Sequence, residues 1–299
     1  MKILLFGANG QLGIELRASL RGLGEVVPVT PDGVLPNGET GEVVDFEYVA
    51  ALAPLIARVA PDLVVNAAAY TAVDQAEDAP DVAFRVNAEA PGAIAAACAA
   101  RGIRLVHYST DYVFAGDARR PYAEDDAPAP VNVYGASKLA GERAIQSADP
   151  RHLIVRTSGL YAEHSGNFLT TMLRLARERD EIRVVDDQTG TPTSARTVAS
   201  TTARLLAGPA PIDGIWHLAA QGGVTWHAFA VAIFEQAFAR GLISRIPRTV
   251  AIASAEFAAR ARRPAYSALD SRRLRNVYDV ALPDWRDDLA ATLARFDPQ

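Results

Sequence analysis

The chain has 299 residues, which at about 150 residues per domain predicts roughly two domains. Asp and Glu outnumber Lys and Arg by 35 to 30, so the formal charge is −5, and this balance does not indicate a nucleic-acid partner. Hydrophobic residues make up 49% and charged residues 22%, which is typical of soluble globular domains and excludes disordered and fibrous classes. Cys98 is the single cysteine, which excludes an intrachain disulfide.

No segment of the sequence indicates export or a membrane anchor. The apolar run after Lys2 is shorter than the ~7–15 residues of a signal-peptide core. No other run reaches the ~18 uncharged apolar residues that a membrane span requires. We therefore expect a cytoplasmic protein with no membrane partner and no nucleic-acid partner.

Short apolar runs alternate with longer amphipathic ones, a pattern typical of βαβ units around a parallel sheet. The predicted strands are residues 3–6, 25–29, 63–65, 104–108, 153–155 and 215–218. The predicted helices are residues 12–23, 47–59, 82–100, 137–146, 168–179 and 227–240. The sequence thus predicts an α/β fold, a doubly wound parallel sheet of the Rossmann type with a smaller C-terminal α/β domain. We place the first domain at residues 1–155, with later segments interleaved, and a mainly substrate-binding domain at residues 156–299.

Three glycines follow the first predicted strand. Gly7, Gly10 and Gly13 have the spacing GxxGxxG at a strand-to-helix junction. Glycines there permit a tight turn and let backbone N–H groups approach a pyrophosphate, although an ordinary turn with a close helix contact has the same pattern. At this position the pattern predicts a bound dinucleotide, NADH or NADPH, and the second strand ends without the acid or Arg that would distinguish them. Asp45 and Phe46 either contact the adenine or form a turn and part of the core.

Tyr134 and Lys138 are four residues apart, so on a helix their side chains lie on the same face. An ammonium beside a phenol favours the phenolate, so we expect Lys138 to lower the pKa of Tyr134 from about 10 towards the operating pH. The lysine can also hold the ribose of a nicotinamide. A half-buried tyrosine and a solvated lysine are the alternative, which the glycine turn makes the weaker interpretation.

Polar side chains follow the strand that ends at Tyr108. Ser109, Thr110 and Asp111 are expected at the carboxyl edge of the sheet, where open α/β sheets bind ligands. A hydroxyl there can donate to a substrate carbonyl oxygen while Tyr134 gives its proton. A strand-end turn held by these side chains is the alternative.

Together these motifs resemble the extended short-chain dehydrogenases/reductases, and most closely their dTDP-4-dehydrorhamnose reductase family, over about residues 1–290. The most specific matching blocks are residues 5–7 with 10–13, 65–74, 107–114, 132–135 with 138–142, and Asp187-Gln188 with Gly190, Pro192 and Thr193. The resemblance implies hydride transfer from NADPH or NADH to the keto carbon of a dTDP-sugar, dTDP-4-dehydro-L-rhamnose. It also implies a monomer or a homodimer.

The resemblance implies roles for individual residues. Tyr134 would donate the proton, Lys138 would assist it and hold the nicotinamide ribose, and Thr110 would bond the substrate carbonyl with Asp111 beside it. The residues implied to bind the cofactor are Gly7, Gly10, Gln11, Leu12, Gly13, Asp45, Phe46, Ala69, Tyr70, Thr71, Tyr134 and Lys138. The residues implied to face the nucleotide sugar are Thr110, Asp111, Asn167, Phe168 and Gln188.

Two positions depart from the family pattern. Gly159 stands where the family carries Trp, so we expect an aromatic wall for the sugar to be missing. Arg196 stands where some relatives carry an acid that helps to hold a magnesium ion between subunits, and Glu15 alone cannot make that site. The histidines show no metal-ligand spacing. We therefore expect no metal.

Two other functions fit parts of the sequence. One is a different NAD(P)-dependent nucleotide-sugar enzyme, an epimerase or a dehydratase. Dehydratases commonly carry Thr-Asp-Glu, whereas Tyr112 follows Asp111 here, which favours reduction. The other is a non-catalytic regulatory subunit resembling the β subunit of methionine adenosyltransferase. The presence of Tyr134, Lys138 and Thr110 favours catalysis over that function.

Overall fold

A seven-stranded, entirely parallel sheet forms the centre of the computed structural model, which describes residues 1–36, 38–148 and 151–296. The strand order is β11-β6-β5-β4-β1-β2-β3. The strands are β1 (Lys2–Phe6), β2 (Glu25–Thr30), β3 (Glu42–Val43), β4 (Leu63–Asn66), β5 (Arg104–Thr110), β6 (His152–Thr157) and β11 (Gly214–His217). The chain runs outwards in one direction from β1 to β3 and in the other from β4 to β11, so the order switches between β1 and β4, where such sheets bind ligands.

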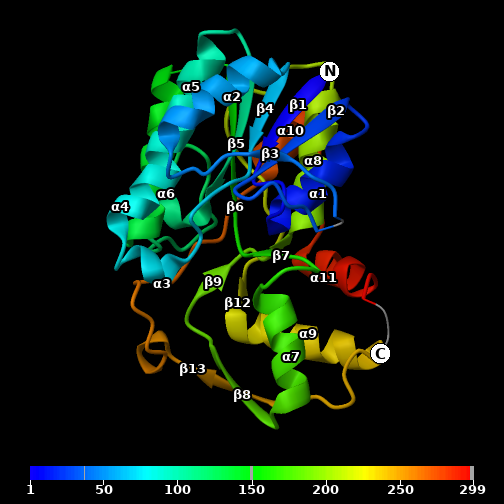
Figure 1. Ribbon diagram of the computed structural model, residues 1–299. Helices are drawn as coiled ribbons and strands as arrows, with labels where there is room; N and C mark the ends of the chain where they lie inside the picture. The colour runs from blue at the N-terminus through cyan, green and yellow to red at the C-terminus, as the bar shows by residue number, and fades with distance from the viewer. Residues whose placement is uncertain (37, 149–150, 297–299) are drawn as a thin grey trace.

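Helices cover both faces of this sheet (Figure 1). One face carries α1 (Gln11–Leu20), α8 (Ala195–Ala207) and α10 (Arg272–Tyr278), and the other carries α2 (Leu52–Val59), α5 (Ala90–Ala99) and α6 (Val133–Ala148). Successive strand residues point to opposite faces, so Ile3 and Leu5 pack in the first layer and Leu4 and Phe6 in the second. Burial on both faces explains the continuous apolar runs in these strands. The predicted doubly wound parallel sheet is confirmed.

The helix predicted at residues 82–100 is three pieces, α4 (Pro80–Phe84), a π-helical turn η2 (Arg85–Glu89) and α5. Pro91 explains the wide turn, because proline has no N–H to donate and its ring clashes with the carbonyl four residues earlier, that of Asn87. The Asn87 carbonyl lies against Gly141 of α6, where an added Cβ would come within 2.1 Å of the oxygen.

A second, smaller group of elements lies below the sheet in Figure 1. Its helices, α7 (Phe168–Glu178), α9 (Trp226–Ala239) and α11 (Trp285–Leu293), share an apolar core. Its strand pairs are β7 (Leu160–Tyr161) with β10 (Thr193–Ser194), β8 (Glu181–Val185) with β13 (Arg248–Ile252), and β9 (Thr189–Gly190) with β12 (Val224–Thr225). The division into two domains at residue 155 stays a prediction. Although β11, α8 and α10 come after residue 155 in the chain, they belong to the large sheet and to one of its helical layers.

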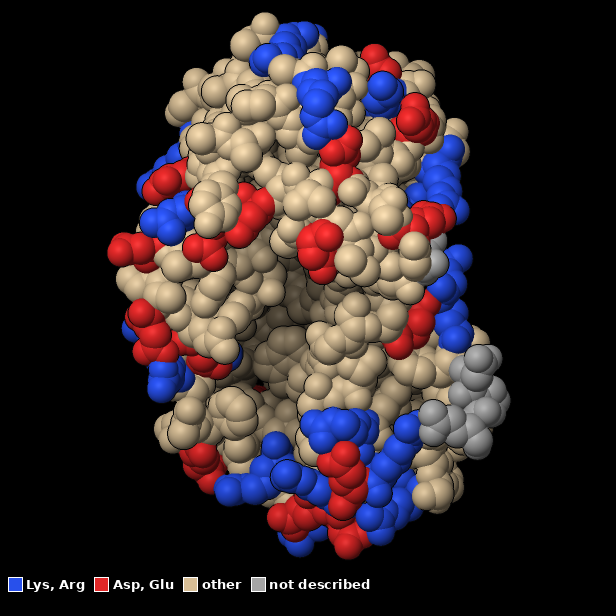
Figure 2. All heavy atoms as spheres, viewed as in Figure 1, with Lys and Arg blue, Asp and Glu red and all other residues tan. Residues whose placement is uncertain are grey.

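The remaining short helices are η1 (Val49–Ala51), α3 (Val73–Ala76), η3 (Asp111–Val113) and η4 (Ser254–Glu256). Figure 2 shows a hollow between the two groups of elements, with most of the charged side chains of this face around it rather than inside it. Among the described residues, no helix has both the length and the apolar character needed to cross a bilayer.

Candidate active site

Two cavities open at the carboxyl edge of the large sheet. The larger has a volume of about 600 Å³ and extends from the glycine turn along the strand ends. The smaller, of about 160 Å³, lies between the sheet edge and β9 and β12. The residues that line both are Thr71, Thr110, Asp111, Tyr134, Ser158 and Gly159. The larger cavity falls within the ~300–1,000 Å³ typical of ligand sites, and the shared residues mark where two bound molecules would meet.

The glycine turn joins β1 to α1 with little space. Gly7 has a φ of +75°, and an added Cβ there would lie 2.6 Å from the Ala68 nitrogen. At Gly13 a Cβ would lie 2.0 Å from the carbonyl oxygen of Gly7, so Gly13 serves the close approach of helix to turn and does not itself line the larger cavity. Gly10, Gln11 and Leu12 do line it.

The N-terminus of α1 is suited to an anion. Gly10 precedes the helix without a side-chain cap, and the first turn carries no acidic residue. The first N–H groups of a helix have no partner within it, and the helix dipole places partial positive charge there. A pyrophosphate beside the cavity-lining residues of this turn would satisfy both features, so the residues present fit a dinucleotide.

Asp45 and Phe46 line the larger cavity. Phe46 is also part of the core, because its ring meets the Phe6 ring edge-on with 5.4 Å between centroids. Asp45 accepts a hydrogen bond from the backbone nitrogen of Glu47 at 2.9 Å, as expected of a turn. Both interpretations of this pair are thus compatible with the structure.

The Ala69–Thr71 segment lines the same cavity and is held by Asn87. The Asn87 side chain accepts from the Tyr70 nitrogen at 2.9 Å and donates to the Tyr70 oxygen at 3.0 Å. It also donates to Ser137, whose hydroxyl donates to the carbonyl of Tyr134. Asn87 therefore links the loop that lines the larger cavity to the helix that carries Tyr134. The one signal for it in the sequence is a polar side chain next to an alanine-rich helix.

Tyr134 and Lys138 both lie within α6, which begins four residues earlier than predicted. Asn132 explains the earlier start, because its side chain accepts from the Gly135 nitrogen at 2.7 Å as a helix cap does. The Tyr134 hydroxyl is hydrogen-bonded to that of Thr110. The structure thus brings together the phenol and the hydroxyl that the sequence analysis assigned to one reaction.

Asp111 lies beneath these hydroxyl groups and is 4% exposed. Its carboxyl accepts from Thr110 at 3.1 Å and from Ser158 at 2.9 Å, and it also bonds Ser267. Burial raises the pKa of Asp111 to about 6 although these hydrogen bonds act in the opposite direction. Asp111 therefore holds Thr110 and Ser158 in place where the two cavities meet.

The pKa of Tyr134 departs from expectation. Burial raises it to about 12, so the prediction that Lys138 lowers it is wrong for this structure. The Lys138 ammonium donates to the carbonyl of Tyr108 at 2.6 Å, and burial lowers the pKa of Lys138 to about 8. Desolvation outweighs the attraction between charges at this site, and Tyr134 keeps its proton at neutral pH as a proton donor must.

His107 and Asn66 also contact this group, and the sequence analysis did not assign them to it. The Asn66 oxygen accepts from the Ala68 nitrogen, which leaves its amide nitrogen 3.1 Å from His107 Nδ1. His107 Nε2 lies 3.4 Å from Lys138 Nζ. Burial, followed by the charge of Lys138, lowers the pKa of His107 well below its usual value, so the imidazole is neutral. An apolar strand around His107 gives no sign of this contact in the sequence.

The other residues expected to face the sugar do not all lie in one cavity. Gln188 lines the smaller cavity and donates to Ser254 at 2.7 Å. Asn167 lines the larger cavity and caps α7. Phe168 lines neither cavity; its ring packs against that of Trp226, with 4.7 Å between centroids. Trp226, which the sequence analysis did not single out, lines the smaller cavity.

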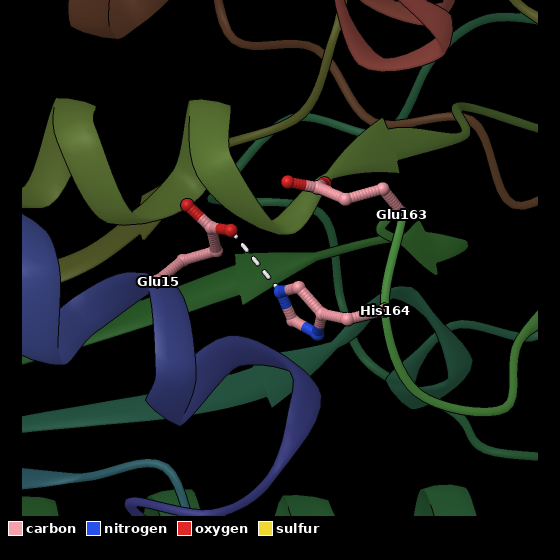
Figure 3. Close-up of side chains that lie close together, drawn as sticks. All are labelled: Glu15, Glu163 and His164. Carbon is pink, nitrogen blue, oxygen red and sulfur yellow. Dashed lines mark hydrogen bonds and ion pairs between the residues drawn. The ribbon is translucent and has the colours of Figure 1, made fainter. Parts of the chain in front are cut away.

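Glu15, Glu163 and His164 form a separate ionisable cluster that lines neither cavity (Figure 3). Their potential ligand atoms lie within 4.8 Å of one another. His164 Nε2 is 3.1 Å from Glu15, and Glu163 pairs with Arg295. Each side chain therefore has a protein partner, and the expectation of no bound metal stays a prediction.

Comparison with known proteins agrees with this geometry. Residues 1–297 match a family model described as the RmlD substrate binding domain. A dTDP-4-dehydrorhamnose reductase of Shigella flexneri is 42% identical over 289 residues, covering 96% of this chain and 95% of that one. One from Burkholderia thailandensis is 44% identical over 295 residues, with 96% of each chain covered. A crystal structure of dTDP-4-dehydrorhamnose reductase from Bacillus anthracis in complex with NADP has a TM-score of 0.90 and 33% identity, with 99% of each chain covered. This chain therefore belongs to the dTDP-4-dehydrorhamnose reductase family.

Proposed function

We propose that this chain reduces dTDP-4-dehydro-L-rhamnose to dTDP-L-rhamnose with NADPH or NADH, as a step in the synthesis of dTDP-L-rhamnose. One observation carries the proposal: Tyr134 and Thr110 line both the cavity that fits a dinucleotide and the cavity beside it. A reductase needs a proton donor and a carbonyl-binding hydroxyl where cofactor and substrate meet. The family to which the chain belongs supports the identity of the sugar.

Each side chain has a separate role in the proposed reduction. Reduced nicotinamide supplies a hydride to the keto carbon when it is bound. The carbonyl oxygen then needs a proton, and the Tyr134 hydroxyl, protonated at neutral pH, supplies it. Asp111 accepts the single hydroxyl proton of Thr110 at 3.1 Å, and Thr110 turns that proton to the carbonyl oxygen when the ketosugar binds. Lys138, which lines the larger cavity, holds the nicotinamide ribose.

The other binding residues follow from where they lie. Gly7, Gly10, Gln11, Leu12 and the Ala69–Thr71 segment contact the dinucleotide, with Asp45 and Phe46 at its adenine end. Gln188 contacts the nucleotide sugar from the smaller cavity. Asn167, which the resemblance assigns to the sugar, lines the larger cavity instead, and Gly13 and Phe168 act from behind the cavity walls. A cytoplasmic location and a monomeric or homodimeric state stay predictions from the sequence.

The test is an assay of the purified chain with dTDP-4-dehydro-L-rhamnose and each of NADPH and NADH. We expect one molecule of cofactor to be oxidised for each molecule of dTDP-L-rhamnose formed, with the preferred cofactor giving the higher kcat/KM. Turnover of the sugar without net oxidation of cofactor would identify an epimerase or a dehydratase instead. Cofactor binding with no turnover would favour the regulatory-subunit alternative.

A further inference from the structure

Trp226 stands at the junction between the smaller cavity and the second group of elements. It is the first residue of α9, directly after β12, and it lines the cavity together with Thr110 and Tyr134 from the sheet edge. Its side chain is partly exposed, whereas Trp216 and Trp285 are 4% and 2% exposed. An indole in such a position has a free face beside the reacting groups.

The backbone of Trp226 is fixed from both sides. β12 pairs with β9, so Thr225 lies opposite Thr189, and the Trp226 nitrogen donates to the Gln188 carbonyl at 3.4 Å. Thr225 caps α9 by accepting from the Ala228 nitrogen at 3.1 Å. The same short strand pair that positions Gln188 therefore also positions the indole.

The indole ring is supported by other aromatic rings. Phe168 packs on it at a tilt of 45° with 4.7 Å between centroids, and Phe229 lies 6.3 Å away. Aromatic contacts of this kind hold a ring in place while leaving its other face available. Phe168 thus reaches the cavity through Trp226 rather than directly.

Gly159 provides the space that Trp226 uses. An added Cβ at Gly159 would lie 3.3 Å from the Cη2 atom of Trp226 and 3.1 Å from the Cα of Pro192. Gly159 also has a φ of +53°, which L-residues rarely adopt. A larger residue at position 159 would press on the indole, so the two positions are sterically linked. The expectation that this side of the pocket lacks an aromatic wall is wrong, because Trp226 lines it.

We infer that Trp226 is a sugar-binding and specificity-determining residue, whose indole packs against the C–H face of a nucleotide-linked 6-deoxyhexose in the smaller cavity. This inference rests on the proposed function and adds to it the residue that recognises the hexose. The chemistry suits the ligand class, since a 6-deoxyhexose carries a methyl group where other hexoses carry a hydroxyl. An apolar ring favours that methyl group, and removing water from both surfaces stabilises the complex.

Fluorescence tests the contact directly. Titration of the NADP⁺-bound enzyme with dTDP-L-rhamnose is expected to quench tryptophan emission. The quenching is expected to persist in Trp216→Phe and Trp285→Phe, which alter buried indoles outside the smaller cavity, and to disappear in Trp226→Phe. Quenching that persists in Trp226→Phe and disappears in either control would overturn the inference.

Kinetics tests the energetic contribution. Trp226→Ala is expected to raise the KM for the ketosugar about tenfold, the equivalent of a lost aromatic contact, while the Kd for NADPH stays within about twofold. Trp226→Phe is expected to recover most of the loss. A KM for Trp226→Ala within about twofold of wild type would contradict the inference. An inactive wild-type enzyme would count against the proposed function. An active wild type whose KM is unchanged in Trp226→Ala would count against the role of Trp226 alone.

Discussion

At the scale of single residues, burial decides the protonation of the reacting groups more than their spacing does. Tyr134 and Lys138 are four residues apart on one helix, a spacing that lets two side chains interact. The ammonium of Lys138 is nevertheless directed at the Tyr108 carbonyl. The phenol bonds Thr110 and keeps its proton. The proposed role of Tyr134 as an acid therefore rests on its retained proton and its hydrogen bond to Thr110, and not on a lowered pKa.

Replacing Tyr134 by Phe is expected to lower kcat by about 10²–10⁴-fold, because the variant lacks the proton that the carbonyl oxygen needs. The Kd for NADPH should change little, since the phenyl ring keeps its edge-on contact with Tyr112. Steady-state kinetics and a cofactor titration check the two parts. Tyr278→Phe, which removes a hydroxyl bonded to the Pro211 carbonyl outside both cavities, is the matched control. A kcat in Tyr134→Phe equal to that of the control would remove Tyr134 from the mechanism.

Lys138 makes stability depend on pH. Its pKa is about 8 in the folded chain against 10.5 for the free group, so the unfolded chain binds more protons between these values. The free energy of unfolding therefore rises with pH between about 8 and 10.5. Below pH 8 the full cost of burying the charged ammonium is present. Lys138→Met should raise the free energy of unfolding at pH 7 by about 3 kcal/mol, less the lost hydrogen bond, while abolishing turnover.

Chemical denaturation at pH 7 and pH 10 measures this effect. The advantage of Lys138→Met over wild type is expected to shrink as the pH rises, because the lysine of the folded wild-type chain is then uncharged and its burial costs less. An advantage of equal size at both pH values would show that burial of the ammonium is not the cause.

At the scale of elements, the approach of α1 to the β1 turn determines the cofactor site. Gly13→Ala places a Cβ 2.0 Å from the Gly7 carbonyl oxygen. We expect it to lower the free energy of unfolding by about 1–3 kcal/mol and to weaken NADPH binding by displacing the helix N-terminus. Gly22→Ala is the control, because no atom of the described residues beyond its own chain neighbours lies within 4 Å of its added Cβ. Denaturation curves and cofactor titrations compare the two, and equal behaviour would contradict the packing argument.

The sequence predicts the elements of the sheet well and those of the second group less well. The short apolar runs of β1 and β5 each follow a basic residue, Lys2 or Arg104, and both strands could be located to within two residues. The π-helical turn at Arg85–Glu89 could not be predicted from the apolar pattern, because it depends on how Pro91 is accommodated next to the Asn87 carbonyl. The helix of Tyr134 begins at Val133 because of the Asn132 cap, whose amide looks like part of a loop in the sequence.

The candidate site shows the same division. The YxxxK pair and the glycine turn are local patterns and could be predicted. Trp226 and Asn87 reach the site only because distant segments pack together, which no local spacing records. The pKa of Tyr134 depends on how much of the molecule covers it, and that is also a tertiary property.

At the scale of the whole molecule, the segment that follows β13 returns to the sheet and passes beside α3 (Figure 1). Arg263 donates twice to Asp74, at 2.7 and 3.1 Å, and the Ala261 nitrogen donates to the same carboxylate at 3.0 Å. The hydrogen bond from Arg263 lowers the pKa of Asp74, so the carboxylate stays charged to a lower pH than an unpaired one would. Arg263 also bonds Tyr112, which lines the smaller cavity.

Asp74→Asn is expected to lower the free energy of unfolding by about 1 kcal/mol, a modest value because the carboxylate is 40% exposed. It should raise the KM for the sugar more than the Kd for NADPH, because Arg263 and Tyr112 then lose a fixed position. Glu42→Gln breaks a similar two-bond pair with Arg58 on the surface of the large sheet and should leave the KM unchanged. Equal KM values for the two variants would show that the Asp74–Arg263 pair does not affect the site.

Hydride transfer can be followed with NADPH labelled with deuterium at the transferred position of the nicotinamide. The proposed mechanism predicts that dTDP-L-rhamnose formed by this chain carries one deuterium at C4 of the sugar, seen by mass spectrometry and NMR. It also predicts that Tyr134→Phe forms the same labelled product far more slowly. An unlabelled product, or label at another carbon, would contradict hydride transfer to the keto carbon at the meeting point of the two cavities.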